Sequence, residues 1–255
     1  MSAEGLTQRR QQSRIIGMDR KDFVEGAKDS VAIVVGYFSV SFTFGIVAAQ
    51  AGLSPFLATL MSLTNVTSAG QFAGLNLIIV QSSYLEMFLT QLVINLRYGL
   101  MSLSLSQHLD KKSTTGKRML IAFANTDEIF AVSVVKPHKV SPSYMAGLEI
   151  FPILSWALGT FFGAVANNLL PAAISSALGI ALYGMFVAIV MPVARSHKSV
   201  AIAVIFAACL SLAFHFVPGL KAISSGFTII ICTIAASALA AWLFPVPEDD
   251  GGDAV

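Results

Sequence analysis

Residues 62–97 read SLTNVTSAGQFAGLNLIIVQSSYLEMFLTQLVINLR, and this stretch decides what kind of fold the chain adopts. Its first third is a string of small, hydroxylated and amide residues, although long apolar runs lie on both sides of it. Near its far end, Asn95 and Arg97 interrupt another apolar run. Because unpaired polar backbone is costly in hydrocarbon, irregular polar segments occur at membrane depth only where they are buried in protein or line a cavity. The stretch therefore predicts a solute path through a membrane.

The composition sets the class of protein. Hydrophobic residues make up 55% of the 255 residues and charged residues only 12%, with a mean hydropathy of +0.75. A soluble domain carries about 25% charged residues, and half of that fraction does not cover a surface in water. Several apolar runs also exceed the roughly 18 residues that mark a transmembrane helix. The sequence predicts an all-α fold, a polytopic transmembrane helix bundle.

The two ends of the chain are polar and the region between them is apolar. Residues 1–30 carry six Lys and Arg residues ahead of the first apolar run, and the positive-inside rule places such a segment in the cytoplasm. We expect a cytoplasmic tail with a short interfacial helix and no cleavable signal peptide. Residues 31–245 form the predicted transmembrane transport domain, and residues 246–255 form a polar C-terminal tail.

Eight apolar segments follow one another, at residues 31–51, 56–80, 84–108, 119–135, 145–166, 169–193, 200–217 and 222–244. Polar residues interrupt the second, and the acidic pair Asp127–Glu128 lies near the middle of the short fourth segment. If both of these segments cross the membrane, the basic loop at 110–118 lies outside. If both are broken or re-entrant, every basic loop falls inside with the N-terminus. The second arrangement follows the charge rule better, and it predicts six full spans plus two broken or re-entrant helices.

A faint pattern recurs along the chain and allows an internal repeat. A Gly-rich span, a turn containing Leu and Pro, and a Gly-interrupted span occur around residues 36–80 and again at residues 159–184. Many transporters are built from such repeats.

Two helix starts are predicted inside the membrane. Residues 68–71, Ser-Ala-Gly-Gln, fit a capping box with Ser68 as the cap. Residues 125–128, Asn-Thr-Asp-Glu, are a looser version with Asn125 as the cap. A helix start presents free N–H groups and a partial positive charge, and discontinuous helices of transporters use such ends to hold an anionic group of the substrate.

Ionisable residues within the apolar segments are few, and burying one costs at least ~2.5 kcal/mol on insertion scales. Arg97 and the Asp127–Glu128 pair lie deepest, whereas Glu86, Glu149 and Lys221 lie near segment ends and are expected at the interface. An ion pair between Arg97 and one of the two acids is the purely structural alternative. We predict proton coupling at Asp127 and Glu128, and substrate binding by Asn65, Ser68, Ala69, Gly70, Gln71, Asn95 and Arg97.

No motif indicates an enzyme, a cofactor, a metal site or a nucleic-acid partner. The two cysteines, Cys209 and Cys232, lie inside apolar runs without disulfide or metal-ligand spacing, and there is no nucleophile–base arrangement and no phosphate loop. The alternatives to a transporter are a membrane-embedded enzyme acting on lipid and a non-transporting scaffold. An enzyme would need a polar catalytic set near the interface, for which the sequence offers only Asp127–Glu128.

A set of short motifs, taken in order, resembles one known family. The motifs are EGAKDS at 25–30, FTFG at 42–45, AGLSP at 51–55, AGQF at 69–72, NLR at 95–97 and TDEIFA at 126–131. They are similar to those of the AzlC family, the large subunits of bacterial branched-chain amino acid exporters. Two positions depart from the family pattern. Gly70 stands where a small hydroxylated residue is common, and Tyr98 stands where His is common.

The resemblance implies a function and a partner. It implies export of apolar amino acids such as valine, leucine, isoleucine or methionine across the bacterial cytoplasmic (inner) membrane. It also implies a small membrane subunit of the AzlD type. Because the sequence has no nucleotide-binding motif, we expect the proton gradient to drive export. The two departures bear on the exact substrate more than on the class of protein.

Overall fold

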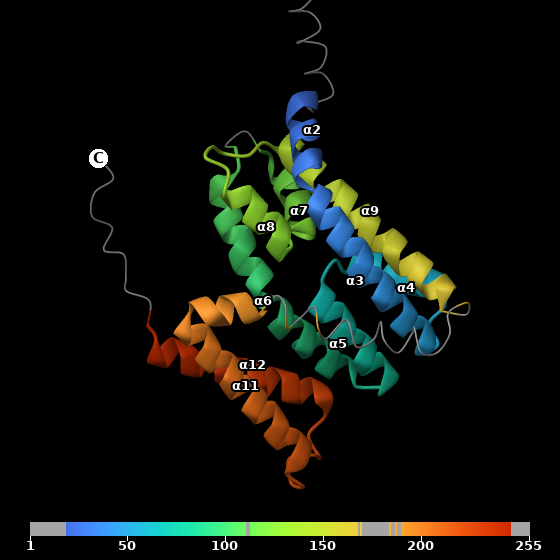
Figure 1. Ribbon diagram of the computed structural model, residues 1–255, viewed down its shortest axis with the longest axis vertical. Helices are drawn as coiled ribbons and strands as arrows, with labels where there is room; N and C mark the ends of the chain where they lie inside the picture. Colours follow the sequence, from blue (N-terminus) through green and yellow to red (C-terminus); the bar gives the residue numbers. More distant parts are fainter. Residues whose placement is uncertain are drawn as a thin grey trace, which may run out of the picture. The chain divides into compact units, whose positions relative to one another are not determined.

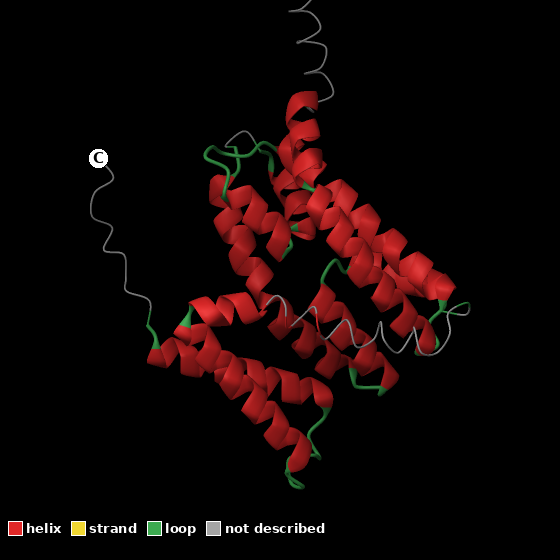
Figure 2. Ribbon diagram, viewed as in Figure 1, coloured by secondary structure: helices red, strands yellow, loops and turns green. Residues whose placement is uncertain are grey.

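The computed structural model describes residues 19–110, 113–167, 169, 184, 187 and 190–245. Over these residues the fold is all-helical, as Figure 2 shows, which confirms the predicted helix bundle. Four of the described helices are long and apolar enough to cross a membrane: α3 (Val31–Gln50), α9 (Pro142–Ala166), α11 (Lys198–Phe216) and α12 (Ser225–Leu243). Shorter or more polar helices lie between them along the chain: α2 (Arg20–Asp29), α4 (Pro55–Thr64), α5 (Ser68–Ile79), α6 (Tyr84–His108), α7 (Thr115–Ala124) and α8 (Asp127–Val134).

The chain forms two compact units. The first comprises residues 1–72 and 95–179, and the second comprises residues 73–94 and 180–255. The division between the units therefore runs through α5 and α6. Each unit is described below by itself.

The first unit is built on α9, along which α2 and α3 pack (Figure 1). The helices run in the same direction, because Phe23 lies against Gly147, Val34 against Ser155 and Phe42 against Gly163. A Cβ atom on Gly147 would lie 2.1 Å from the Phe23 carbonyl oxygen, and one on Gly163 would lie 2.0 Å from that of Phe42. Only glycine permits this approach, as small residues do at helix contacts in lipid.

Several chain segments converge at the end of the first unit where α2 meets α9. The Ser141 hydroxyl donates to Asp22, and Lys136 lies 2.8 Å from both Glu25 and Asp29. The end of α6 is also here, because the His108 carbonyl accepts from the Val140 N–H. The start of α7 is here too, since Arg118 donates to the Ser106 carbonyl near the end of α6. Helices α7 and α8 thus form a hairpin that begins and ends at the same end of the unit.

Helix α4 begins at the opposite end of the first unit, directly after α3. Gly52 makes the turn between them with a φ of +89°, a left-handed conformation that glycine adopts without penalty. Helix α4 is capped by Ser54, whose hydroxyl accepts from the Leu57 N–H, and Pro55 is the first helical residue. Helix α4 packs against α9 and ends at Thr64.

The second unit contains α11 and α12, which pack against each other, together with the first part of α6. Glu86 of α6 is buried and accepts hydrogen bonds from the Ser224 hydroxyl and the Gly226 N–H. Its carboxylate therefore caps the start of α12, where a negative charge is favourable. The sequence placed Glu86 at a segment end, and the structure gives it a partner inside the protein.

Helix α6 has the bounds predicted for the third apolar segment, residues 84–108. The predicted span at 169–193 lies largely outside the described residues. The internal repeat stays a prediction, because its second copy falls mostly on the same part of the chain.

Candidate functional site

Both predicted breaks are present, and each is followed by a threonine cap. Between α4 and α5, the Thr67 N–H donates to the Asn65 carbonyl at 2.9 Å. Between α7 and α8, the Thr126 N–H donates to the Ala124 carbonyl at the same distance. The N–H of the third residue of the new helix then donates to the threonine hydroxyl, from Gly70 in α5 and from Ile129 in α8.

The predicted caps were therefore wrong by one residue at both places. Thr67 rather than Ser68 caps α5, and Thr126 rather than Asn125 caps α8. Thr67 and Ser68 both have side chains suited to capping, and so do Asn125 and Thr126. The turn before each helix places the cap at Thr67 in the first pair and at Thr126 in the second.

The start of α8 is tied to α3 by a tyrosine. The Tyr37 hydroxyl, which is buried, lies 2.5 Å from Thr126 Oγ1 and 2.8 Å from Glu128 Oε2. A tyrosine hydroxyl has one proton, so it donates to only one of these oxygens at a time. The Tyr37 ring packs edge-on against Trp156 with centroids 5.2 Å apart, which holds the hydroxyl in place. Glu128 is thus engaged by α3 rather than by the N–H groups of its own helix.

Arg97 of α6 lies against the same helix start. Its Nη1 atom is 2.6 Å from Asp127 Oδ2, and the two side chains are 47% and 43% exposed. The guanidinium also lies 5.0 Å from the centre of the Tyr98 ring, and its Nη2 atom donates to the Tyr98 hydroxyl at 3.3 Å. The ion pair that the sequence allowed as an alternative is therefore formed. It is half-exposed rather than sealed in the core.

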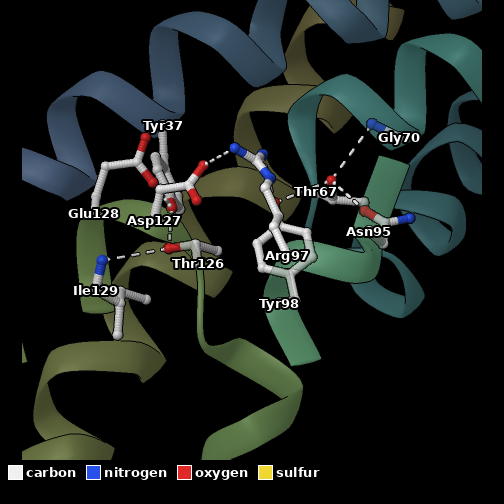
Figure 3. Close-up of polar contacts among 10 residues, drawn as sticks. All are labelled: Tyr37, Thr67, Gly70, Asn95, Arg97, Tyr98, Thr126, Asp127, Glu128 and Ile129. Atoms are coloured by element: carbon white, nitrogen blue, oxygen red, sulfur yellow. Dashed lines mark hydrogen bonds and ion pairs between the residues drawn. The ribbon is translucent and has the colours of Figure 1, made fainter. Parts of the chain in front are cut away.

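Tyr98 connects Arg97 to the start of α5. Its hydroxyl donates to Thr67 Oγ1 at 3.1 Å, and the Thr67 hydroxyl donates in turn to Asn95 Oδ1 at 3.1 Å. Figure 3 shows the result, in which polar contacts run from the α8 start through Arg97 and Tyr98 to the α5 start. Arg97 and Asn95 lie roughly 200° apart on a regular helix, and they reach different partners.

The other predicted substrate residues occupy different environments. Gln71 is fully buried, and both ends of its amide are used: Oε1 accepts from the Trp156 indole and Nε2 donates to the Ser62 hydroxyl. Ser62 in turn bonds Thr160 of α9, so Gln71 fastens the start of α5 to α9. Gly70 is buried behind the Thr67 cap, while the partly exposed residues are Asn65, Ser68 and Ala69.

Four residues of the site were absent from the predicted set: Tyr37, Thr67, Tyr98 and Thr126. The only sequence signal at Tyr98 is its departure from the family pattern. Tyr37 carries no local signal, since a lone tyrosine in an apolar span is ordinary packing, and its role depends on a contact 91 residues away.

The arrangement offers charged and polar groups without a metal site. Among the described residues, no group of three His, Cys, Asp or Glu side chains is placed to hold a metal ion. One guanidinium and two carboxylates meet at a pair of helix starts, which suits ligands that carry charge and groups that exchange protons.

Comparisons with known proteins place these features in a family. The family model described as AzlC protein matches residues 32–170, which is more than half of the chain. Inner membrane protein YgaZ of Escherichia coli (strain K12) is 30% identical over 187 residues, covering 71% of this chain and 76% of that protein. An uncharacterized membrane protein of Archaeoglobus fulgidus is 31% identical over 223 residues, covering 86% and 94%. No solved structure matches the chain.

Proposed function

This chain belongs to the AzlC family, and on that premise we propose that it exports apolar amino acids: valine, leucine, isoleucine and methionine. Family membership and the membrane-protein relatives support a role in membrane transport. The observation that carries the proposal is the meeting of two helix starts at the Arg97–Tyr98 segment of α6. Transporters place substrates at such interrupted helices.

We propose Arg97 as the main partner of the substrate carboxylate. A guanidinium binds a carboxylate through two parallel hydrogen bonds, which gives both energy and orientation. The start of α5 adds a partial positive charge next to it, and Tyr98 holds Arg97 towards that start. The half-exposed state of the Arg97 side chain leaves room for a ligand.

We propose proton coupling at the α8 start, on Asp127 or Glu128. A proton-driven exporter needs a group that changes protonation as the site faces each side of the membrane. Both carboxylates lie next to groups that respond to their charge, Arg97 for Asp127 and Tyr37 for Glu128. Further charged groups within the described spans are sparse, as hydrocarbon requires.

We further propose that α7–α8 is a re-entrant hairpin that enters from the cytoplasmic side. Its two ends share one end of the first unit with α2 and the start of α9. That end collects basic residues, as the positive-inside rule requires of a cytoplasmic face: Arg20, Lys21, Lys28, Lys117, Arg118, Lys136 and Lys139. The E. coli relative is named an inner membrane protein, which supports the same membrane for this chain. The basic residues at this end of the unit support a cytoplasmic N-terminus.

A small membrane subunit of the AzlD type is the proposed partner. Helices α11 and α12 are strongly apolar, and most of their side chains are not buried within the chain. They also carry many small residues, which favour close helix contacts in lipid. Co-purification of the two proteins from membranes tests this proposal, and full export by this chain alone in proteoliposomes would refute it.

The function itself is tested by efflux from loaded cells. Cells lacking their own exporters and loaded with isotopic leucine are expected to release it faster when they express this chain with its small subunit. Arg97→Ala should abolish the difference, while Arg195→Ala, at an exposed arginine in the second unit, should retain it. Equal efflux with and without the wild-type chain would favour the membrane enzyme or the scaffold instead.

A further inference from the structure

Among the ion pairs of the described residues, Arg97–Asp127 is the pair that lies within the polar site, and nearly half of each side chain is exposed. The pairs made by Lys136 lie at the end of the first unit, where helices α2 and α9 meet. Ionisable residues within membrane spans are costly and therefore pair with one another, as this guanidinium and carboxylate do. They also present the two charges that complement a zwitterion.

The two acids of the α8 start are not equivalent. Glu128 is held by the Tyr37 hydroxyl at 2.8 Å, and Tyr37 is itself fixed by packing against Trp156. Asp127 has Arg97 as its charged partner and is 43% exposed. Figure 3 shows the Asp127 carboxylate directed at Arg97, whereas Glu128 is directed at Tyr37. Glu128 is exposed as well, so what distinguishes Asp127 is its charged partner. Asp127 is the acid that a ligand reaches by separating an ion pair.

We infer that the Arg97–Asp127 pair is the empty form of an amino-acid zwitterion site, in which Arg97 takes the substrate carboxylate and Asp127 takes its ammonium group. The inference rests on the proposed function and specifies which atoms of the substrate are read. Inserting a zwitterion replaces one charge-assisted contact with two, and it leaves no charge unpaired. A ligand that has a carboxylate but no ammonium leaves Asp127 unpaired, and an amine without a carboxylate leaves Arg97 unpaired.

The same arrangement makes the substrate ammonium and a proton compete for Asp127. A protonated Asp127 does not hold an ammonium, so proton binding on one side favours amino-acid release there, which is the sign that antiport requires. The titratable and charged groups around Asp127 are Arg97 and Tyr98 on α6, Tyr37 on α3 and the adjacent Glu128.

Three ligands with the same isobutyl side chain test the inference: leucine, its oxo acid 4-methyl-2-oxopentanoate, and its amine 3-methylbutylamine. Binding is measured on the full-length protein, purified with any subunit that accompanies it. Asp127→Asn should weaken leucine by roughly ten- to a hundred-fold, the range for loss of one charged hydrogen bond. The same variant should strengthen the oxo acid, because Asp127 no longer competes for Arg97. Arg97→Ala should have the reverse effect: binding of the oxo acid should be lost, and binding of the amine should become stronger.

The matched control is Glu25→Gln, a carboxylate that pairs with Lys136 at the end of the first unit, and it should leave the order of the three ligands unchanged. If Asp127→Asn shifts leucine and the oxo acid in the same direction, or leaves leucine unchanged, the inference is wrong while the proposed function stands. Absence of leucine efflux by the wild type would overturn the proposed function and this inference together.

A measurement on the wild type alone decides the matter if the variants do not fold. As the pH falls from 8 to 5, leucine affinity should fall because its ammonium loses an ionised Asp127. The affinity of the oxo acid should rise over the same range, because Arg97 is released. Opposite slopes support a shared site for ammonium and proton. Parallel slopes for the two ligands would overturn it.

Discussion

At the start of α5 the side chains around the break are neutral: Thr67, Asn95 and Tyr98 share hydrogen bonds, and Gln71 is buried against α9. At the start of α8 the same backbone turn and the same threonine cap are surrounded by two carboxylates, a guanidinium and the Tyr37 hydroxyl. The two breaks thus use one local structure with different charge. A neutral helix start keeps its partial positive charge at every physiological pH, whereas the α8 start changes charge when a carboxyl group takes up a proton.

This difference gives the α5 start and the α8 start separate roles in the proposed transport cycle. The α5 start provides a permanent dipole beside Arg97, and the α8 start provides the carboxyl groups that bind and release the proton. Arg97 lies between them and contacts both, directly through Asp127 and through Tyr98 towards Thr67. Changes on the α5 side are expected to alter affinity alone. Changes on the α8 side are expected to alter the response to pH, together with affinity where Asp127 itself is changed.

Removing the group that joins the two breaks should have the largest effect. Arg97→Ala should lower leucine efflux by roughly a hundred-fold, because the substrate carboxylate loses a paired, charged contact. Arg97→Lys keeps the charge but loses the planar fork, and a loss of roughly ten-fold is expected. Initial efflux rates, normalised to the amount of protein in the membrane, measure both. A folded Arg97→Ala variant with unchanged affinity for leucine would leave Arg97 a structural role only.

The next largest effects are expected when the two acids of α8 are neutralised one at a time. Asp127→Asn should remove the dependence of efflux on the pH gradient, because the group that exchanges its proton is gone. Glu128→Gln should retain that dependence with a shifted pH midpoint, because Glu128 is held by Tyr37 rather than by the ligand partner Arg97. Efflux at zero and at one unit of imposed pH gradient distinguishes the outcomes. Unaltered dependence in both variants would place the coupling group elsewhere.

Much of this comparison is visible in the sequence, for a physical reason. Polar residues inside apolar runs have no satisfactory partner in lipid, so the breaks at 65–67 and 125–126 were predictable. The deep position of Arg97, Asp127 and Glu128 in the sequence likewise singled them out, while their roles in binding and coupling stay predictions. Polar residues on both sides of residues 84–108 likewise fixed the bounds of α6.

The partners across helices were not predictable in the same way. Capping propensity is nearly equal for neighbouring Ser, Thr and Asn residues, so the choice of Thr67 and Thr126 depends on the turn that precedes each helix. Tyr37 and Gln71 acquire their roles through α8 and α9, which are 85 to 91 residues distant in the chain. Such contacts follow from the packing of α3 along α9, and no local pattern encodes them.

Exchanging the tyrosine of each break for phenylalanine should have a smaller and more selective effect. Tyr37→Phe keeps the ring against Trp156 and removes the hydroxyl beside Glu128, so the pH midpoint of efflux should move with little change in leucine affinity. Tyr98→Phe removes the two hydrogen bonds that link Arg97 to Thr67, so affinity should fall at least several-fold, with the pH midpoint unchanged. If both variants shifted the midpoint equally, the two helix starts would not differ in function.

The smallest effect is expected at the far end of α8, where Lys136 pairs with Glu25 and Asp29 outside the spans. Partial burial raises the pKa of Asp29, but hydrogen bonds from Lys136 and Tyr144 outweigh it, and the net pKa lies below the ordinary value of 3.8. Hydrogen bonds to Asp29 and Glu25 raise the pKa of Lys136 above its ordinary value of 10.5. The stability from Asp29 is present above 3.8 and lost as the pH falls through its folded pKa. The stability from Lys136 is present below 10.5 and lost as the pH rises through its folded pKa.

This ion cluster should therefore stabilise the protein by the same amount at every pH from 5 to 9. Lys136→Met should lower the free energy of unfolding by up to about 1 kcal/mol, since the cluster is partly exposed, and the loss should not vary within that range. Thermal unfolding in detergent, on wild type and variant at several pH values, measures the difference. A loss that grew or vanished between pH 5 and 8 would mean that the far end of α8 also responds to protons there. The pH dependence of transport would then no longer be assignable to the start of α8 alone.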